Sequence, residues 1–262
     1  MQLDAEDFPR RLRAVADSPD VVSIRRNTMH ALELFGISTA YYVAPITGDA
    51  RVSRIVTNIG LPWIWERQYR ARLHLIDPLP RIAIDRLEAF VWPDQLGDEK
   101  LSPKERRYLS IAAKYGLARG VAVACFGPNG RSGFLGAVLS KDAPTPDGIA
   151  LMRIHSLGQT SIQRYCRLVP RTVTIPALSN RELEVLHWIG QGKSNSVIAE
   201  LLEISPSSVD VYVRRLFAKL DVSDRTMAAV KALSLGMIIS GDYTKMLKDA
   251  AQLQPPGGSS LD

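Results

Sequence analysis

The sequence SNSVIAELLEISPSSVDVYVRRLFAKL, residues 194–220 of the 262-residue chain, constrains the fold more than any other stretch. Ser205 is suited to cap a helix that starts at Pro206, because proline lacks the N–H that would be unpaired there. The apolar residues that follow at helical spacing are Val209, Val213, Leu216 and Leu220. A shorter helix, at about 195–202, comes before them. The pattern predicts a helix-turn-helix, whose second helix enters the DNA major groove. The alternative is an ordinary helical hairpin with a solvated basic face.

Helix signals continue on both sides of this segment. Upstream, Ser179 and Glu182 form a capping-box pattern before an apolar run that ends near Gly192. Downstream, residues 224–236 predict a fourth helix. Its apolar residues Met227, Val230, Ala232 and Leu235 are expected to lie mostly on one side.

Residues 178–238 resemble the four-helix DNA-binding domain of the LuxR family of transcription regulators. The matching residues are Glu182, Leu186, Gly192, Lys193, Ser194, Asn195, Ile198, Ala199, Val209, Leu220, Val222, Arg225 and the run 230–233. The resemblance implies a homodimer that binds an inverted repeat in double-stranded DNA. The residues expected to contact DNA are Lys193, Ser194, Asn195, Ser207, Ser208, Asp210, Val211, Arg214, Arg215 and Lys219.

Two residues depart from the family pattern. Glu203 stands where the turn usually has glycine, which costs about 1 kcal/mol if the position needs a positive φ. Asp210 stands where lysine or asparagine is common. It has two interpretations of equal weight: an acid that stabilises the start of its helix, or an acceptor for a cytosine amino group.

The rest of the composition excludes several classes of function. The 46% hydrophobic content suits a soluble globular protein, and the net charge of +6 permits a nucleic-acid partner. No apolar stretch is long enough to span a membrane, and the acidic start does not resemble a signal peptide, so a cytoplasmic protein is expected. Cys125, Cys166 and the four histidines show no metal-ligand spacing. We find no catalytic constellation, and expect neither an enzyme nor a cofactor.

The first two-thirds of the chain mixes helical and strand periods. Helices are predicted at 5–17, 20–35, 62–73, 102–116 and 146–168, and strands at 38–45 and 51–59. A hairpin is predicted through Pro128-Asn129-Gly130. Hairpins between helices favour an α+β sandwich, an antiparallel sheet flanked by helices. We therefore predict a sensor domain at 1–168, a linker at 169–177 and an all-α helix-turn-helix domain at 178–240. A tail follows at 241–262, and its end is expected to be disordered.

The predicted sensor domain is dense in aromatic residues, each of which alone is typical of a core. Together they resemble the acyl-homoserine-lactone-binding domain of LuxR-type quorum-sensing regulators, and the residues in the matching places are Trp65, Tyr69, Asp77, Pro78, Trp92 and Gly120. The resemblance implies that the Trp65 indole donates to the lactone carbonyl and that Asp77 accepts the ligand amide N–H. Trp92 would pack on the ring, and Tyr69 would line the acyl chain.

Two hydroxyl donors of close relatives are missing here. Leu61 stands at the position of a tyrosine that donates to the acyl carbonyl, and Leu139 aligns with a serine or threonine that serves the same group. The sequence thus predicts a transcription regulator controlled by a small signal molecule, with an N-acyl-homoserine lactone as the expected ligand. The alternative is an orphan, ligand-independent regulator whose pocket is packed or repurposed.

Overall fold

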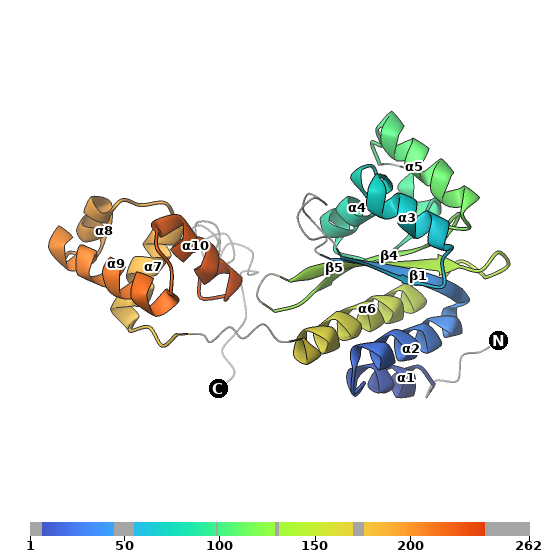
Figure 1. Cartoon of the computed structure of the whole chain (residues 1–262), viewed down its shortest axis with the longest axis horizontal. Helices are drawn as coiled ribbons and strands as arrows, with labels where there is room; N and C mark the ends of the chain where they lie inside the picture. The colour runs from blue at the N-terminus through green and yellow to red at the C-terminus, as the bar shows by residue number, and fades with distance from the viewer. Residues whose placement is uncertain (1–6, 45–54, 98, 129–130, 170–175, 239–262) are drawn as a thin grey trace, which may run out of the picture. The chain divides into compact units, whose positions relative to one another are not determined.

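Contacts divide the chain near residue 171 into two compact units (Figure 1). The computed structural model describes residues 7–44, 55–97, 99–128, 131–169 and 176–238. Most of the predicted linker and the whole predicted tail lie outside these ranges. The same is true of Asn129 and Gly130 in the predicted hairpin turn.

A five-stranded antiparallel sheet forms the centre of the first unit. Its strands are β1 (Ile37–Ala44), β2 (Ile55–Ile59), β3 (Phe90–Trp92), β4 (Gly120–Phe126) and β5 (Ser132–Leu139). Their order across the sheet is β2-β1-β5-β4-β3. The predicted strands on either side of Pro128 pair with each other as β4 and β5.

Helices cover both faces of this sheet (Figure 1). One face packs on α1 (Asp7–Ala16), α2 (Val21–Leu32) and α6 (Gly148–Leu168). The other lies under α3 (Trp63–Ala71), α4 (Leu79–Arg86) and α5 (Pro103–Lys114). Short 3-10 helices are η1 (Glu33–Phe35), η2 (Leu73–Leu75) and η3 (Asp94–Leu96). The predicted α+β class, an antiparallel sheet flanked by helices, is confirmed.

Side chains of β5 alternate between the two faces, as the two-residue period of a strand requires. Phe134 and Val138 belong to the core under α3–α5, whereas Leu135 and Leu139 belong to the core under α1, α2 and α6. The prediction that Leu139 lines one pocket with Trp65 is therefore wrong, because the sheet separates the two side chains.

Helix α4 and strand β3 of the first unit were not predicted. Two prolines, Pro78 and Pro80, lie at the start of helix α4 and interrupt its apolar pattern in the sequence. Proline is nevertheless tolerated in the first turn of a helix. Strand β3 has three residues, too few to show a period. Both elements matter, because α4 and β3 hold Asp77 and Trp92 in place.

The second unit is the predicted bundle of four helices. They are α7 (Asn180–Gly190), α8 (Asn195–Leu201), α9 (Pro206–Leu220) and α10 (Arg225–Ser234). The capping box of Ser179 and Glu182 is present, and Ser205 caps α9 with Pro206 at its first position. Both predictions are confirmed, as is the helical class of this region.

The buried side of α10 differs from the prediction. Ala228 and Ala232 are buried, whereas Met227 and Val230 are 49% and 61% exposed. Small alanines let α10 approach α7 and α9 closely, so the larger apolar side chains turn outward. The prediction that these residues lie mostly on one side is therefore wrong, because Ala232 and Leu235 are buried and Met227 and Val230 are exposed.

The turn between α8 and α9 requires a left-handed residue, and Glu203 supplies it with a φ of 53°. We expect Glu203→Gly to raise the free energy of unfolding of the second unit by roughly 0.5–1 kcal/mol, because glycine adopts this region without strain. Amide hydrogen exchange of α8 and α9 in the full-length protein measures the change.

The control for this prediction is Glu200→Gly, in the exposed part of α8. There glycine should lower stability by about 1 kcal/mol, since it only adds backbone freedom. A loss of protection in both variants would contradict the strain at Glu203.

Candidate functional site

Five aromatic side chains form a buried group between the sheet and α3–α5, which we name the aromatic cluster. Its members are Tyr41, Trp65, Tyr69, Tyr108 and Phe134, all of them fully buried. The Trp65 and Tyr69 rings are stacked with centroids 4.8 Å apart, since the two residues are one helical turn apart on α3. The Tyr41 ring meets Trp65 edge-on at 4.9 Å. Trp65 and Tyr69 thus lie together, as the sequence indicated.

The indole N–H of Trp65 lacks a hydrogen-bond partner among the residues that the structure describes. The side chain is fully buried, so water does not replace that partner at its surface. A buried polar group left unpaired costs about 1–3 kcal/mol, and such groups are rare in folded proteins. A donor of this kind in an apolar core is suited to bind an acceptor atom of a ligand.

The Asp77 carboxylate lies at the edge of the aromatic cluster and accepts hydrogen bonds from Tyr69 and from the backbone of Leu79. The Tyr69 hydroxyl donates to one oxygen at 2.7 Å, and the Leu79 N–H donates to the other at 3.0 Å. Asp77 is therefore held in place by the start of α4 and by α3. Burial, and next the charge of Asp77, raise the pKa of the Tyr108 hydroxyl well above its ordinary value. The negative charge of Asp77 thus makes it harder for the Tyr108 hydroxyl to lose its proton.

Trp92 differs from Trp65 in that its indole N–H is bonded within the protein, to the Leu117 carbonyl at 3.3 Å. Its ring lies against Gly120 on the neighbouring strand, where a Cβ would be only 2.2 Å from the ring. Glycine at this position is thus a packing requirement of Trp92. Leu61 is buried in the same core, and its backbone is bonded on both sides to the Asn58 side chain.

Three members of the aromatic cluster were missed from the sequence: Tyr41, Tyr108 and Phe134. Strand alternation could not reveal which of Tyr41 and Tyr42 faces the cluster, because a register irregularity separates Ile37 from Thr39 in the pairing of β1 with β5. Tyr42 lies on the other face and bonds to Ser161 at 2.9 Å.

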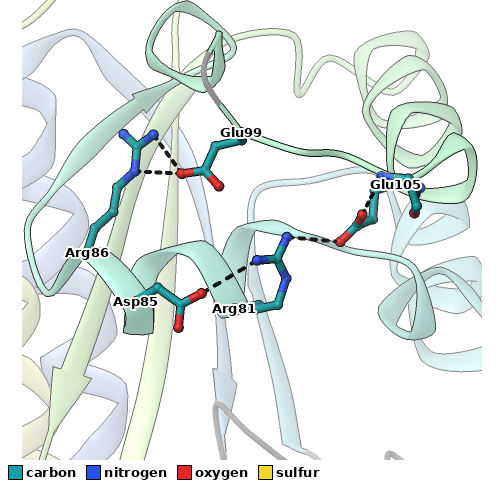
Figure 2. A network of polar contacts seen from close by, with 6 residues as sticks. Arg81, Asp85, Arg86, Glu99 and Glu105 are labelled. Carbon is teal, nitrogen blue, oxygen red and sulfur yellow. Dashed lines mark hydrogen bonds and ion pairs between the residues drawn. The ribbon is translucent and has the colours of Figure 1, made fainter.

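Ion pairs connect the helices and the segment that cover the outer side of this core (Figure 2). Arg81 of α4 pairs with Glu105 at the start of α5 at 3.2 Å and with Asp85 at 3.5 Å. Arg86, at the end of α4, pairs with Glu99 at 2.9 Å. These contacts tie α4 to α5 and to the segment between them, whose leucines Leu96 and Leu101 pack on the core.

The basic side chains Arg214 and Arg215 of α9 are exposed. Neither arginine forms an ion pair within the described part of the chain. On the same helix Ser207, Ser208 and Val211 lie one or two turns earlier, and the Ser207 and Ser208 hydroxyls lie 2.9 and 2.8 Å from that of Ser205. The arginines are therefore available to bind phosphates or base edges.

Asp210 has a role that neither interpretation of the sequence included. Its carboxylate accepts a hydrogen bond from the Asn195 side chain at 2.8 Å, and the Asn195 oxygen accepts one from Arg225 at 2.9 Å. Arg225 also donates to the Lys193 carbonyl, just before the Ser194 cap of α8. This chain of contacts joins α8, α9 and α10.

Lys219 differs from the two arginines because its ammonium group is bonded within the unit, although the side chain is 41% exposed. Its ammonium group lies 2.7 Å from the carboxylate of Glu182, which is buried, and donates to the Ala177 carbonyl at 3.2 Å. Burial acts to raise the pKa of Glu182, but the bonds from Lys219 and Ser179 outweigh it and hold the pKa below 4.5, the ordinary value. Lys219 thus joins α9 to α7.

An α+β unit with an unpaired donor in its core and a separate helix-turn-helix unit together define a ligand-responsive DNA-binding protein. Comparisons with known families agree with this class. The family "Autoinducer binding domain" matches residues 21–165, and "Bacterial regulatory proteins, luxR family" matches residues 176–232. The chain belongs to the LuxR family of bacterial regulatory proteins. It is a signal-dependent transcription regulator and not an enzyme.

Individual relatives cover most of the chain. RpaR of Rhodopseudomonas palustris, a quorum sensing-dependent transcriptional regulator, is 28% identical over 202 residues, which are 76% of this chain and 82% of RpaR. The transcriptional activator SolR of Ralstonia nicotianae is 31% identical over 185 residues, 66% of this chain and 74% of SolR. The crystal structure of Escherichia coli SdiA has the same fold, with a TM-score of 0.63 at 21% identity. That match covers 89% of this chain and 98% of SdiA. Among the helices described, none is long and apolar enough to cross a membrane.

We expect the pair of Glu182 and Lys219 to make the stability of the second unit dependent on pH. Because the pKa of Glu182 is lowered by folding, its stabilisation is fully present above about pH 4.5 and is lost as the pH falls through the lowered pKa. Glu182→Gln should remove that dependence and cost roughly 1–2 kcal/mol at neutral pH, since one end of the pair is half-exposed. Hydrogen exchange of α7 and α9 across pH measures both effects.

The matched control is Glu184→Gln, in the exposed pair of Glu184 with Arg181 on the same helix. This variant should keep the pH profile of the wild type and change stability little. The same acid profile in Glu182→Gln and in the wild type would show that another group titrates.

Proposed function

We propose that the protein is a cytoplasmic, homodimeric regulator that binds an N-acyl-homoserine lactone in the aromatic cluster and an inverted repeat in DNA. The unpaired, buried N–H of Trp65 carries the ligand part of this proposal. A folded core rarely leaves such a donor unpaired, and a lactone carbonyl is an acceptor of suitable size.

The other groups of the cluster suit the remaining atoms of this ligand. An acyl lactone is mostly apolar, which suits the aromatic rings, and it carries one amide N–H, which the Asp77 carboxylate accepts. Trp92, fixed against Gly120, packs on the lactone ring, and Tyr69 lines the acyl chain. Leu61 adds apolar surface without a donor.

A second candidate is a regulator that binds DNA without a ligand. The close contacts of the aromatic rings favour it, since Trp65 lies 4.8 Å from Tyr69 and 4.9 Å from Tyr41 between centroids. The absence of a hydroxyl at Leu61 points the same way. Lactone binding distinguishes the two candidates.

The DNA part of the proposal assigns different tasks to the residues of the second unit. Arg214, Arg215, Ser207, Ser208 and Val211 face the groove, and Lys193 and Ser194 contact the backbone from the start of α8. The hydrogen bond between Asn195 and Asp210 fixes the position of α8 relative to α9. Lys219 supports the far end of α9 through its contact with Glu182. In a homodimer, the exposed Met227, Val230 and Leu233 of α10 form the contact between the two second units.

Ligand binding is tested by thermal unfolding of the full-length protein with a panel of N-acyl-homoserine lactones. A lactone that binds the folded state alone stabilises it by about 2.7 kcal/mol at a hundredfold excess over Kd. Asp77→Asn should reduce this gain more than it reduces the stability of the protein without lactone, because Asn cannot match the charge that the ligand N–H meets.

Asp85→Asn is the control, since Asp85 pairs with Arg81 on the outside of α4. It should leave the response to lactones unchanged. If no lactone raises the melting temperature of the wild type, the sensor proposal fails and the ligand-independent regulator is favoured.

DNA binding is tested with an operator selected from random sequence. The wild type should select two inverted half-sites about one helical turn apart. Arg214→Ala and Arg215→Ala should each weaken operator binding by about tenfold or more, because each removes a free charge from the groove face. Arg181→Ala, which removes an arginine of α7 paired with Glu184, is the control. Full affinity in both α9 variants would exclude this helix from DNA recognition.

A further inference from the structure

Asp210 lies beyond the first turn of α9. The helix begins at Pro206, and no acidic residue stands in its first turn. Stabilisation of an acid by the helix dipole falls off within that turn. The dipole therefore gives Asp210 little stabilisation, and its contacts with other side chains decide what the carboxylate does.

A basic residue follows Asp210 at the spacing of one helical turn. Arg214 comes four residues later, and both side chains are exposed. An acid four residues before an arginine is well placed to form an ion pair with it on the surface of a helix. Within the ranges that the structure describes, Arg214 nevertheless forms no ion pair, and the Asp210 carboxylate is bonded to Asn195 of another helix.

The charges on either side of Asn195 fix the direction of its side-chain amide. The NH2 group donates to Asp210 at 2.8 Å, and the amide oxygen accepts from the Arg225 guanidinium at 2.9 Å. An ionised carboxylate only accepts hydrogen bonds and a guanidinium only donates them, so the reversed amide would lose both bonds. Arg225 thus keeps the NH2 group of Asn195 turned toward Asp210.

Arg225 is placed for this contact rather than for the stability of its own helix. It is the first residue of α10, where the helix dipole disfavours a cation. Burial also lowers the pKa of its guanidinium. The guanidinium therefore needs acceptors, and the Asn195 oxygen and the Lys193 carbonyl supply them. Lys193 is itself fixed, because its N–H donates to the Trp188 carbonyl of α7 at 3.0 Å.

We propose that Asn195, oriented by Arg225, is a positioning residue that keeps the Asp210 carboxylate away from Arg214 and so leaves this arginine free to bind DNA. The inference rests on the DNA part of the function proposed above, in which Arg214 faces the groove. Asn195 then affects operator affinity without a contact to DNA. An acid is tolerated on the recognition helix because its charge is bonded to the neighbouring helix.

The test measures the affinity of the full-length protein for the selected operator by fluorescence anisotropy. Asn195→Ala should weaken binding about three- to fivefold, because the released carboxylate pairs with Arg214. Asp210→Ala should bind at least as tightly as the wild type, since it removes a negative charge from a surface that meets phosphates. Asn195→Ala combined with Asp210→Ala should return to the affinity of the wild type or above it. The loss of a direct DNA contact by Asn195 would not be restored in this way.

Asn180→Ala is the matched control, because it is the same substitution at an exposed position of α7. It should leave operator affinity unchanged. If Asn195→Ala binds like the wild type, or if the double variant stays as weak as Asn195→Ala, the inference is overturned and the proposed function stands. A loss of affinity in Asp210→Ala alone would also overturn it, because Asp210 would then contribute to DNA binding itself. If the wild type selects no operator, the inference and the DNA part of the proposed function fall together.

Discussion

Both faces of the central sheet in the first unit are buried, and the stability of that unit depends on the burial of both faces. Strands β4 and β5 lie between two layers of helices, so their sequences, GVAVACF and SGFLGAVL, are apolar almost throughout. Apolar burial contributes about 25 cal/mol for each Å² removed from water, which makes the two cores the main source of stability. Glycines at positions 120 and 136 are part of the same packing, because the rings of Trp92 and Tyr41 lie directly against them.

The core under α3–α5 differs from the other core in the polar groups that it contains. It holds the Trp65 N–H, the hydroxyls of Tyr41, Tyr69 and Tyr108, and the Asp77 carboxylate at its edge. A core that served packing alone would be more stable with apolar residues at these positions. The cost is consistent with a binding site, where a ligand pairs with a group that the protein leaves unpaired, here the Trp65 N–H. Ion pairs of Arg81 and Arg86 hold the outer wall of this site without adding polar atoms to its interior.

In the second unit, polar contacts between helices fix the position of α9 relative to its neighbours. Asp210, Asn195 and Arg225 connect α9 to α8 and α10, and Lys219 connects α9 to the capping box of α7. Because Arg225 and Lys219 are bonded to partners within the unit, Arg214 and Arg215 carry most of the positive charge on the exposed side of α9. Charge alone therefore does not identify a DNA contact: Lys219 and Arg215 lie one helical turn apart and differ in their partners.

The sequence by itself determined the helix-turn-helix, because caps and apolar periods are local signals that the bundle then reinforces. It also determined the α+β class. Through its resemblance to a known family, it predicted Trp65, Tyr69 and Asp77 as ligand residues, and these three side chains lie together in the structure. Helix α4 and strand β3 were not predicted, because prolines weaken the helical pattern of α4 and β3 is too short to show a strand pattern. Only the tertiary structure decided which way Tyr41, Leu139 and Val230 face. A strand places neighbouring residues on opposite sides, so a one-residue irregularity in β1 changes the side that a tyrosine occupies. The partners of Asp210 and Lys219 likewise come from helices 15 and 37 residues away in sequence, which no local pattern specifies.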